Sequence, residues 1–181
     1  MDGVSETRNY DQNSGTLQVR TGVAGRSARL GHKLLLEPGS WSAVAQVDDG
    51  EPTSLTVTVD ATSLDVTGGD GGLTPLAAPE RAVARSNAQK SLQTKTYPTI
   101  EFRSTAIART DDGFHVEGEL TLCGTTRPCH FALNYDDGAP APALTAVVPV
   151  RQTDFGIKPF SLMMGTLSVA DEVTVFAQAI P

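Results

Sequence analysis

The stretch that decides the fold is residues 113–135, GFHVEGELTLCGTTRPCHFALNY. Apolar and polar residues alternate on both sides of its centre, with the period of two that puts neighbouring side chains on opposite faces of a sheet. The pattern predicts a β-hairpin with one apolar face. A loop at 124–127 would set Leu122 opposite Cys129, and both apolar sets would then share that face.

The composition is that of one ordinary domain. The chain has 181 residues, 39% of them hydrophobic, and a mean hydropathy of −0.14. No apolar run approaches the roughly 18 residues of a membrane span. The net charge is −7 and no basic cluster is present, so nucleic acid is not an expected partner.

The first residues lack the basic start and apolar stretch of a secretory signal. We therefore expect a flexible leader over residues 1–14, followed by a single domain over residues 15–181. A cytoplasmic location is expected unless an export signal has been removed. The sequence leaves open whether the chain forms a homodimer.

Alternating segments recur along the chain and predict about eight antiparallel strands closed into a barrel. One of these strands is interrupted near Pro38, which cannot donate to a ladder. Residues 67–73 are rich in glycine and are expected to form a loop at the rim of the barrel. The only long helical segment, residues 79–94, has a thin apolar face, so it should lie on the surface or cap an opening.

The expected inward residues are mostly Val, Leu and Ala, which favours a cavity over a filled interior. Trp41 could line that cavity or pack in the core. Residues 155–164 are rich in Phe and Met and could form a lid or plug one end of the barrel. The candidate ligand-binding residues are Leu17, Val19, Trp41, Val57, Phe102, Leu120, Leu122, Phe131, Val148, Phe155 and Val175.

No residue pattern indicates catalysis, a metal site or a cofactor. His115 and His130 are expected on the outer face, towards opposite edges of the ladder, and their spacing from the cysteines matches no usual zinc site. His32 follows a glycine at a turn, which favours a structural hydrogen bond. Arg151 and Asp154 could form an ion pair at a corner or contact a ligand head group.

Cys123 and Cys129 flank the hairpin loop but are expected to remain free thiols. The hairpin register puts Cys129 on the apolar face and Cys123 on the polar face. Their Cβ atoms would then point apart, which a disulfide does not allow.

Four segments resemble the YceI-like family, whose members adopt a lipocalin-like antiparallel barrel. They occur in the family's order over the C-terminal half, whereas the N-terminal half departs from the pattern. The resemblance implies an eight-stranded barrel that binds an apolar, isoprenoid-like ligand, and it supplies no catalytic residue. The segments are YPTIEFRS (97–104), GELTLCGTTRP (118–128), RQTDFGI (151–157) and GTLSVADEV (165–173).

The leading hypothesis is a non-catalytic protein that binds, transports or stores an apolar small molecule or polyisoprenoid lipid. The alternative is a filled barrel that serves as a structural or protein-interaction module without a ligand. An enzyme is the weakest hypothesis, because spacing brings no nucleophile within reach of a base.

Overall fold

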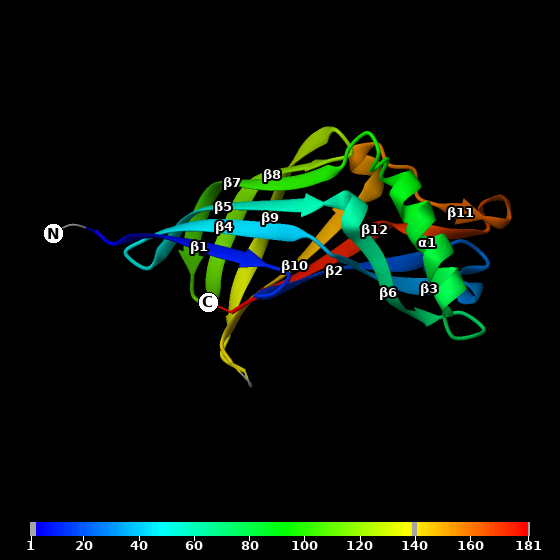
Figure 1. Ribbon diagram of the computed structural model, residues 1–181, viewed down its shortest axis with the longest axis horizontal. Helices are drawn as coiled ribbons and strands as arrows, with labels where there is room; N and C mark the ends of the chain where they lie inside the picture. Colours follow the sequence, from blue (N-terminus) through cyan, green and yellow to red (C-terminus); the bar gives the residue numbers. More distant parts are fainter. Residues whose placement is uncertain (1–2, 139–140, 181) are drawn as a thin grey trace.

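The computed structural model describes residues 3–138 and 141–180. They form one strongly curled antiparallel sheet of twelve strands, with the shape of a half-barrel, and one α-helix across an end (Figure 1). The strands are β1 (Ser5–Asp11), β2 (Gly15–Ala24), β3 (His32–Pro38), β4 (Trp41–Asp48), β5 (Glu51–Asp60), β6 (Leu64–Gly71), β7 (Thr99–Thr110), β8 (Gly113–Leu122), β9 (Thr125–Asp136), β10 (Ala143–Arg151), β11 (Ser161–Leu162) and β12 (Leu167–Ala179).

The all-β antiparallel class agrees with the sequence prediction, but the count of eight strands and the closure into a barrel are wrong. The strand order is β1-β4-β5-β7-β8-β9-β10-β12-β2-β3-β6, with β11 paired to β12. In this order β1 and β6 are the two ends of the sheet. The helices are α1 (Ala78–Ser91) and the 3-10 turns η1 (Ala28–Leu30), η2 (Ala61–Ser63), η3 (Gln152–Phe155) and η4 (Met163–Gly165).

Kinks in the N-terminal half account for part of the higher strand count. The expected interruption near Pro38 separates β3 from β4, and η2 separates β5 from β6 in the same way. The two kinks are joined because Gly39 N donates to Ser63 O at 3.0 Å. As a result β3 pairs with β6 whereas β4 pairs with β5, so each kink directs the chain into another part of the sheet.

Two segments expected to be irregular are strands instead. The flexible leader predicted over 1–14 is wrong for residues 5–11, which form β1 and pair with β4. An edge strand needs no continuous apolar face, and its charged residues suit the exposed edge of a sheet. The glycine-rich loop predicted over 67–73 is also mostly strand, since β6 continues to Gly71. At Gly69 a Cβ atom would lie 2.9 Å from Leu76, so this strand runs where a side chain would not fit.

The β8–β9 hairpin forms, but in a different register from the one predicted. The turn is Cys123-Gly124, with φ values of 52° and 74°, and Leu122 therefore pairs with Thr125 instead of Cys129. Positive φ at both turn positions is what a tight two-residue hairpin requires. The alternation survives because the shift is an even number of residues, so the apolar residues of both strands still share the inner face.

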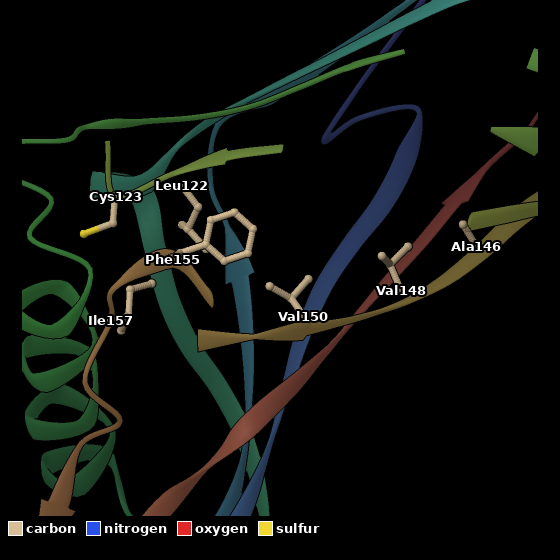
Figure 2. Packing of buried hydrophobic residues seen from close by; sticks show 7 residues of the cluster. All are labelled: Leu122, Cys123, Ala146, Val148, Val150, Phe155 and Ile157. Carbon is tan, nitrogen blue, oxygen red and sulfur yellow. The ribbon is translucent and has the colours of Figure 1, made fainter. Parts of the chain in front are cut away.

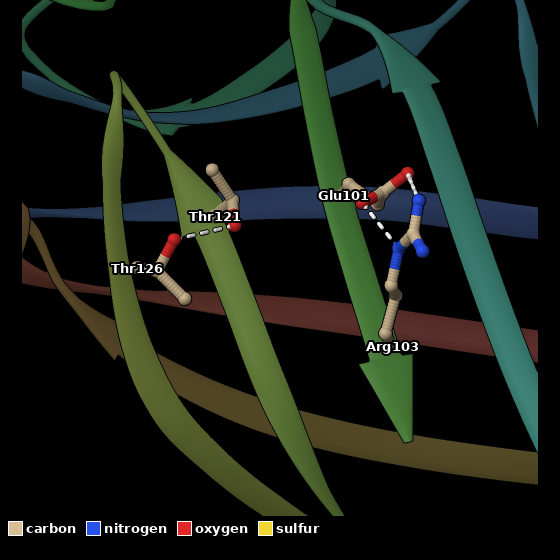
Figure 3. A network of polar contacts seen from close by, with 4 residues as sticks. All are labelled: Glu101, Arg103, Thr121 and Thr126. Atoms are coloured by element: carbon tan, nitrogen blue, oxygen red, sulfur yellow. Dashed lines mark hydrogen bonds and ion pairs between the residues drawn. The ribbon is translucent and has the colours of Figure 1, made fainter. Parts of the chain in front are cut away.

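Polar pairs cover the outer face of this hairpin and of the neighbouring strand β7 (Figure 3). Arg103 Nε donates to Glu101 Oε1 at 2.6 Å, and the hydroxyls of Thr121 and Thr126 lie 2.8 Å apart across the β8–β9 ladder. The Arg103 guanidinium lowers the pKa of the Glu101 carboxyl, mainly by donating this hydrogen bond. These pairs make the outer face of the three strands polar, whereas their inner face is mainly apolar.

Helix α1 lies where the sequence predicts a surface helix. Its first turn is held by Glu80, whose carboxylate accepts a hydrogen bond from Ala77 N at 2.7 Å. Ala84 and Ala88 pack against a cluster that includes Leu64 and Val66, so the helix covers one end of the sheet. Within the described residues, no helix has the length and apolar character needed to cross a membrane.

Candidate functional site

The curled sheet encloses a cavity of about 1250 Å³. Residues from all twelve strands and from α1 contribute to its wall. The wall consists largely of the inward members of each alternating pair, which is why it is mainly apolar. Along β10, for example, the lining residues are Leu144, Ala146, Val148 and Val150.

The structure places all the predicted ligand-binding residues on the cavity wall except Phe155. That these residues contact a ligand stays a prediction, because their position on the wall does not by itself show binding. Both roles considered for Trp41 are observed. It is 8% exposed in a packed cluster, and it also lines the cavity. The residues on the wall are Leu17, Val19, Trp41, Val57, Phe102, Leu120, Leu122, Phe131, Val148 and Val175.

Phe155 is the one predicted site residue that does not lie on the cavity wall. It is 6% exposed and packs beside Leu122, Cys123 and Ile157, a cluster that we call the packed end (Figure 2). The side chain comes from η3, which follows β10. Phe155 shares a packed cluster with the inward residues Leu122 and Val150, so it fills the packed end and is not among the residues that line the cavity.

The segment 155–164 divides between the two roles considered for it. Phe155 and Ile157 plug the packed end, with Ile157 only 2% exposed. Leu162, Met163 and Met164 are exposed, and Leu162 lies at the edge of the cavity. The sequence could not separate these roles because both parts carry large apolar side chains and neither has a strand or helix pattern that fixes its direction.

The wall includes many residues that the sequence did not single out. The same alternation that identified their neighbours would have found most of them, whereas the α1 residues have no such signal. The additional apolar residues of the strands include Tyr10, Leu34, Leu36, Ala43, Leu55, Val59, Ile100, Val116, Cys129, Leu133, Ala146, Val150, Val173 and Ala177.

Three inward residues of β12 show how open the interior is. Val173, Val175 and Ala177, which we call the open wall, face the cavity but are only half-buried. They contact the packed cluster on one side and empty space on the other. Apolar surface left in this way favours binding of an apolar molecule.

One end of the cavity is polar. Arg8, Arg109 and three aspartates contribute to the wall there. Arg109 Nε donates to both carboxylate oxygens of Glu51, at 2.8 and 2.9 Å, and its guanidinium lies 5.0 Å from the centroid of the Phe114 ring. The ion pair raises the pKa of Arg109, so this cation is permanent.

The histidines separate into two positions. His32 Nε2 lies 2.7 Å from Thr74 O, the structural hydrogen bond that its place at a turn predicted. The expectation that His115 and His130 lie apart is wrong, because their ring centroids are 5.7 Å apart. In the observed register His130 pairs with Glu117, which makes the two histidines diagonal neighbours on the outer face. Among residues 3–138 and 141–180, no group of three potential ligands could hold a metal.

Both cysteines are free thiols, as predicted. Cys129 lines the cavity from β9, whereas Cys123 occupies the hairpin turn with its thiol 3.3 Å from Leu92 O. Burial raises the pKa of both thiols, which keeps them protonated and weakly nucleophilic at neutral pH. Neither thiol has the environment of a catalytic cysteine.

The predicted ion pair between Arg151 and Asp154 does not form. Arg151 lies 3.6 Å from Asp171 of β12 instead, and Asp154 accepts a hydrogen bond from Arg127 through its backbone oxygen. Asp171 also accepts from the backbone N and the hydroxyl of Thr153, at 2.9 and 2.7 Å. The corner is therefore tied to β12, and these bonds lower the pKa of the Asp171 carboxyl.

Comparison with known proteins identifies the domain. The family model of the YceI-like domain matches residues 14–179. BcnA of Burkholderia cenocepacia has a similar structure, with 18% identity, a TM-score of 0.68, and 91% of this chain and 94% of that chain covered. A YceI protein of Campylobacter jejuni matches with 16% identity, a TM-score of 0.53, and 81% and 85% covered. No curated protein matches the chain.

Proposed function

This chain belongs to the YceI-like family, and on that premise we propose that it binds an apolar, isoprenoid-like lipid in the cavity as a non-catalytic carrier or store. The observation that supports this proposal most strongly is the continuous apolar cavity of about 1250 Å³ inside the curled sheet. This volume exceeds the range of roughly 300–1,000 Å³ that suits drug-sized ligands. A long hydrocarbon chain makes better use of it.

The affinity would come mainly from burial of the ligand's hydrocarbon. Each CH2 group removed from water contributes about 0.8 kcal/mol, and the half-buried open wall supplies the surface that receives it. Directional contacts are scarce along this wall. The polar end, with Arg8 and Arg109, is where a head group of the ligand would find partners.

Binding accounts for the site better than the two alternatives. A filled interaction module would need side chains in the space that the cavity occupies. An enzyme would need an activated nucleophile, whereas burial raises the pKa of both cysteine thiols and His32 is held by Thr74. The family, too, is generally one of non-catalytic binding proteins.

The decisive experiment combines two measurements on the same protein. Native mass spectrometry should detect a lipid that co-purifies with the chain, and titration with a fluorescent isoprenoid lipid should saturate. Ala177→Trp would fill the cavity from the open wall and should abolish saturable binding. Thr174→Trp is the matched control, because Thr174 lies on the same strand but not on the wall. Absence of both bound lipid and saturable binding would contradict the proposal.

A further inference from the structure

Three loops meet at the end of the molecule that α1 covers (Figure 1). They are residues 25–31, 71–77 and 158–166. The first contacts the third, because Ser27 N donates to Thr166 O at 2.8 Å. The second is joined to the strand that follows the first by the 2.7 Å contact between His32 and Thr74 O. The loops therefore form one continuous surface.

This surface exposes large apolar side chains without a partner in the described chain. Leu73, Leu162, Met163 and Met164, which we call the apolar rim, are 79%, 52%, 56% and 104% exposed. Met163 and Met164 also adopt positive φ values of 52° and 56°, a conformation that bulky residues avoid. Two consecutive exposed methionines in a strained backbone conformation point to a surface that the rim contacts.

The charge around the apolar rim has the opposite sign to that of the whole protein. The three loops contain Arg26, Arg29 and Lys158 and no acidic residue, although the chain carries a net charge of −7. All three cations are exposed, and none forms an ion pair with another residue of the described chain. Two acidic residues are close to the loops in the sequence. Glu80 is engaged at the start of α1, and Asp70 lies opposite Lys33 in the β3–β6 ladder.

The cavity reaches this surface. Its wall includes Leu30 of the first loop, Leu76 of the second and Phe160 of the third, together with Leu162 of the apolar rim. A molecule that leaves the cavity at this end would therefore pass the three loops that carry the apolar rim and the three cations. Exposed apolar side chains surrounded by cations match the interface of an anionic bilayer.

We propose that the apolar rim docks on the surface of an anionic phospholipid bilayer. The side chains of Met163 and Met164 enter the boundary between head groups and acyl chains, while Arg26, Arg29 and Lys158 contact the lipid phosphates. Docking then joins the cavity to the bilayer, so that an apolar ligand transfers without crossing water. Only this last consequence rests on the proposed lipid carrier function.

Co-sedimentation with vesicles tests the docking directly. The chain should bind vesicles of equal parts phosphatidylcholine and phosphatidylglycerol, and binding should weaken in pure phosphatidylcholine and at high salt. Arg29→Glu should weaken binding about 30-fold, since each basic residue near an anionic surface contributes about fivefold and reversal also adds repulsion. Lys95→Glu, the same exposed charge reversal outside the three loops, should leave binding close to its original value.

The apolar contribution has its own variant pair. Met163→Glu/Met164→Glu should weaken vesicle binding at least about tenfold, because it removes two inserting side chains and adds negative charge. Val147→Glu/Ile180→Glu introduces the same charges at residues that are 62% and 60% exposed outside the loops, and should have a small effect. Circular dichroism should show all four variants folded.

We call Arg29→Glu and Met163→Glu/Met164→Glu the rim variants. Two results would overturn the docking proposal: no binding of the original chain to anionic vesicles, or equal binding by the rim variants and their controls. The fluorescent-lipid titration keeps this outcome separate from the carrier function. Rim variants that lose vesicle binding but keep saturable lipid binding support docking. Vesicle binding that is lost only in the rim variants, in a chain that takes up no lipid, supports docking and contradicts the carrier function alone.

Discussion

The packed end and the open wall are built from the same kinds of residue but have different surroundings. The packed end is one buried cluster (Figure 2), in which each residue is at most 9% exposed; it includes Leu122, Cys123, Phe155 and Ile157. Along the open wall Val175 faces the cavity and remains half-buried. One end of the domain is therefore a close-packed core, whereas the middle of the domain contains a cavity.

Under the proposed function, this difference places stability and lipid binding in separate regions. Close packing at one end and ladder hydrogen bonds along the strands hold the fold, so the centre need not be filled. Substitutions at the packed end should mainly lower the free energy of unfolding. Substitutions on the open wall should mainly change ligand affinity.

The largest effect on stability is expected from Phe155→Ala. Removal of this buried ring leaves a void between Leu122 and Ile157, and such truncations cost about 3–5 kcal/mol. Urea denaturation monitored by circular dichroism measures the loss. Phe155→Leu is the control, and it should cost clearly less because most of the buried volume remains. A loss below about 1 kcal/mol for Phe155→Ala would show that the packed end does not hold the fold.

Gly118→Ala should lower stability by about 2 kcal/mol, through overpacking and not through a void. A Cβ atom at this position would lie 2.3 Å from the backbone oxygen of Arg103 and 2.5 Å from the Phe102 ring. Gly39→Ala is a suitable control, since its Cβ would have ordinary contacts at 3.5 Å or more. Equal denaturation midpoints for the two variants would contradict the close strand approach at Gly118.

Val175→Ala should lower lipid affinity with little loss of stability, the reverse of what is expected at the packed end. The lost side chain faces the cavity, so the free energy of unfolding should fall by only about 1 kcal/mol. The affinity for a fluorescent isoprenoid lipid should fall about fivefold, because the bound chain loses the same apolar contact. Thr174→Ala, on the same strand but off the wall, should leave lipid affinity unchanged. A large stability loss without an affinity change for Val175→Ala would place this residue in a core.

Most of the inner face could be predicted from the alternation alone. Side chains two residues apart lie on one face whatever the strand pairs with, so Leu120 and Val148 were placed correctly. The exact partners could not be predicted in the same way. Because the turn is Cys123-Gly124, Leu122 pairs with Thr125, four residues from the predicted partner Cys129. A shift by an even number of residues keeps each side chain on the same face of the sheet, so the alternation of apolar and polar residues cannot reveal it.

Features that depend on long-range contacts were missed for a physical reason. Strand β1 has no apolar alternation, because a charged edge strand is held by backbone hydrogen bonds to β4. Phe155 was included in the predicted site because its residue type suits a cavity. Its place in the packed end depends on the cluster that it shares with Leu122, which is distant in sequence. Arg151 was given the wrong acidic partner because Asp171 is near in space and distant in sequence.

The smallest effect is expected where the two regions are joined. Asp171 of β12 accepts two hydrogen bonds from Thr153 and so ties η3, which carries Phe155, to the open wall strand. These bonds lower the pKa of Asp171 in the folded protein, so the ionised carboxylate stabilises the fold. That contribution is complete above the unfolded pKa of about 3.9 and is lost as the pH falls through the lower folded value. Asp171→Asn should therefore shift the urea midpoint slightly at neutral pH and not in strong acid, and an equal shift at both pH values would mean that charge at this junction does not matter.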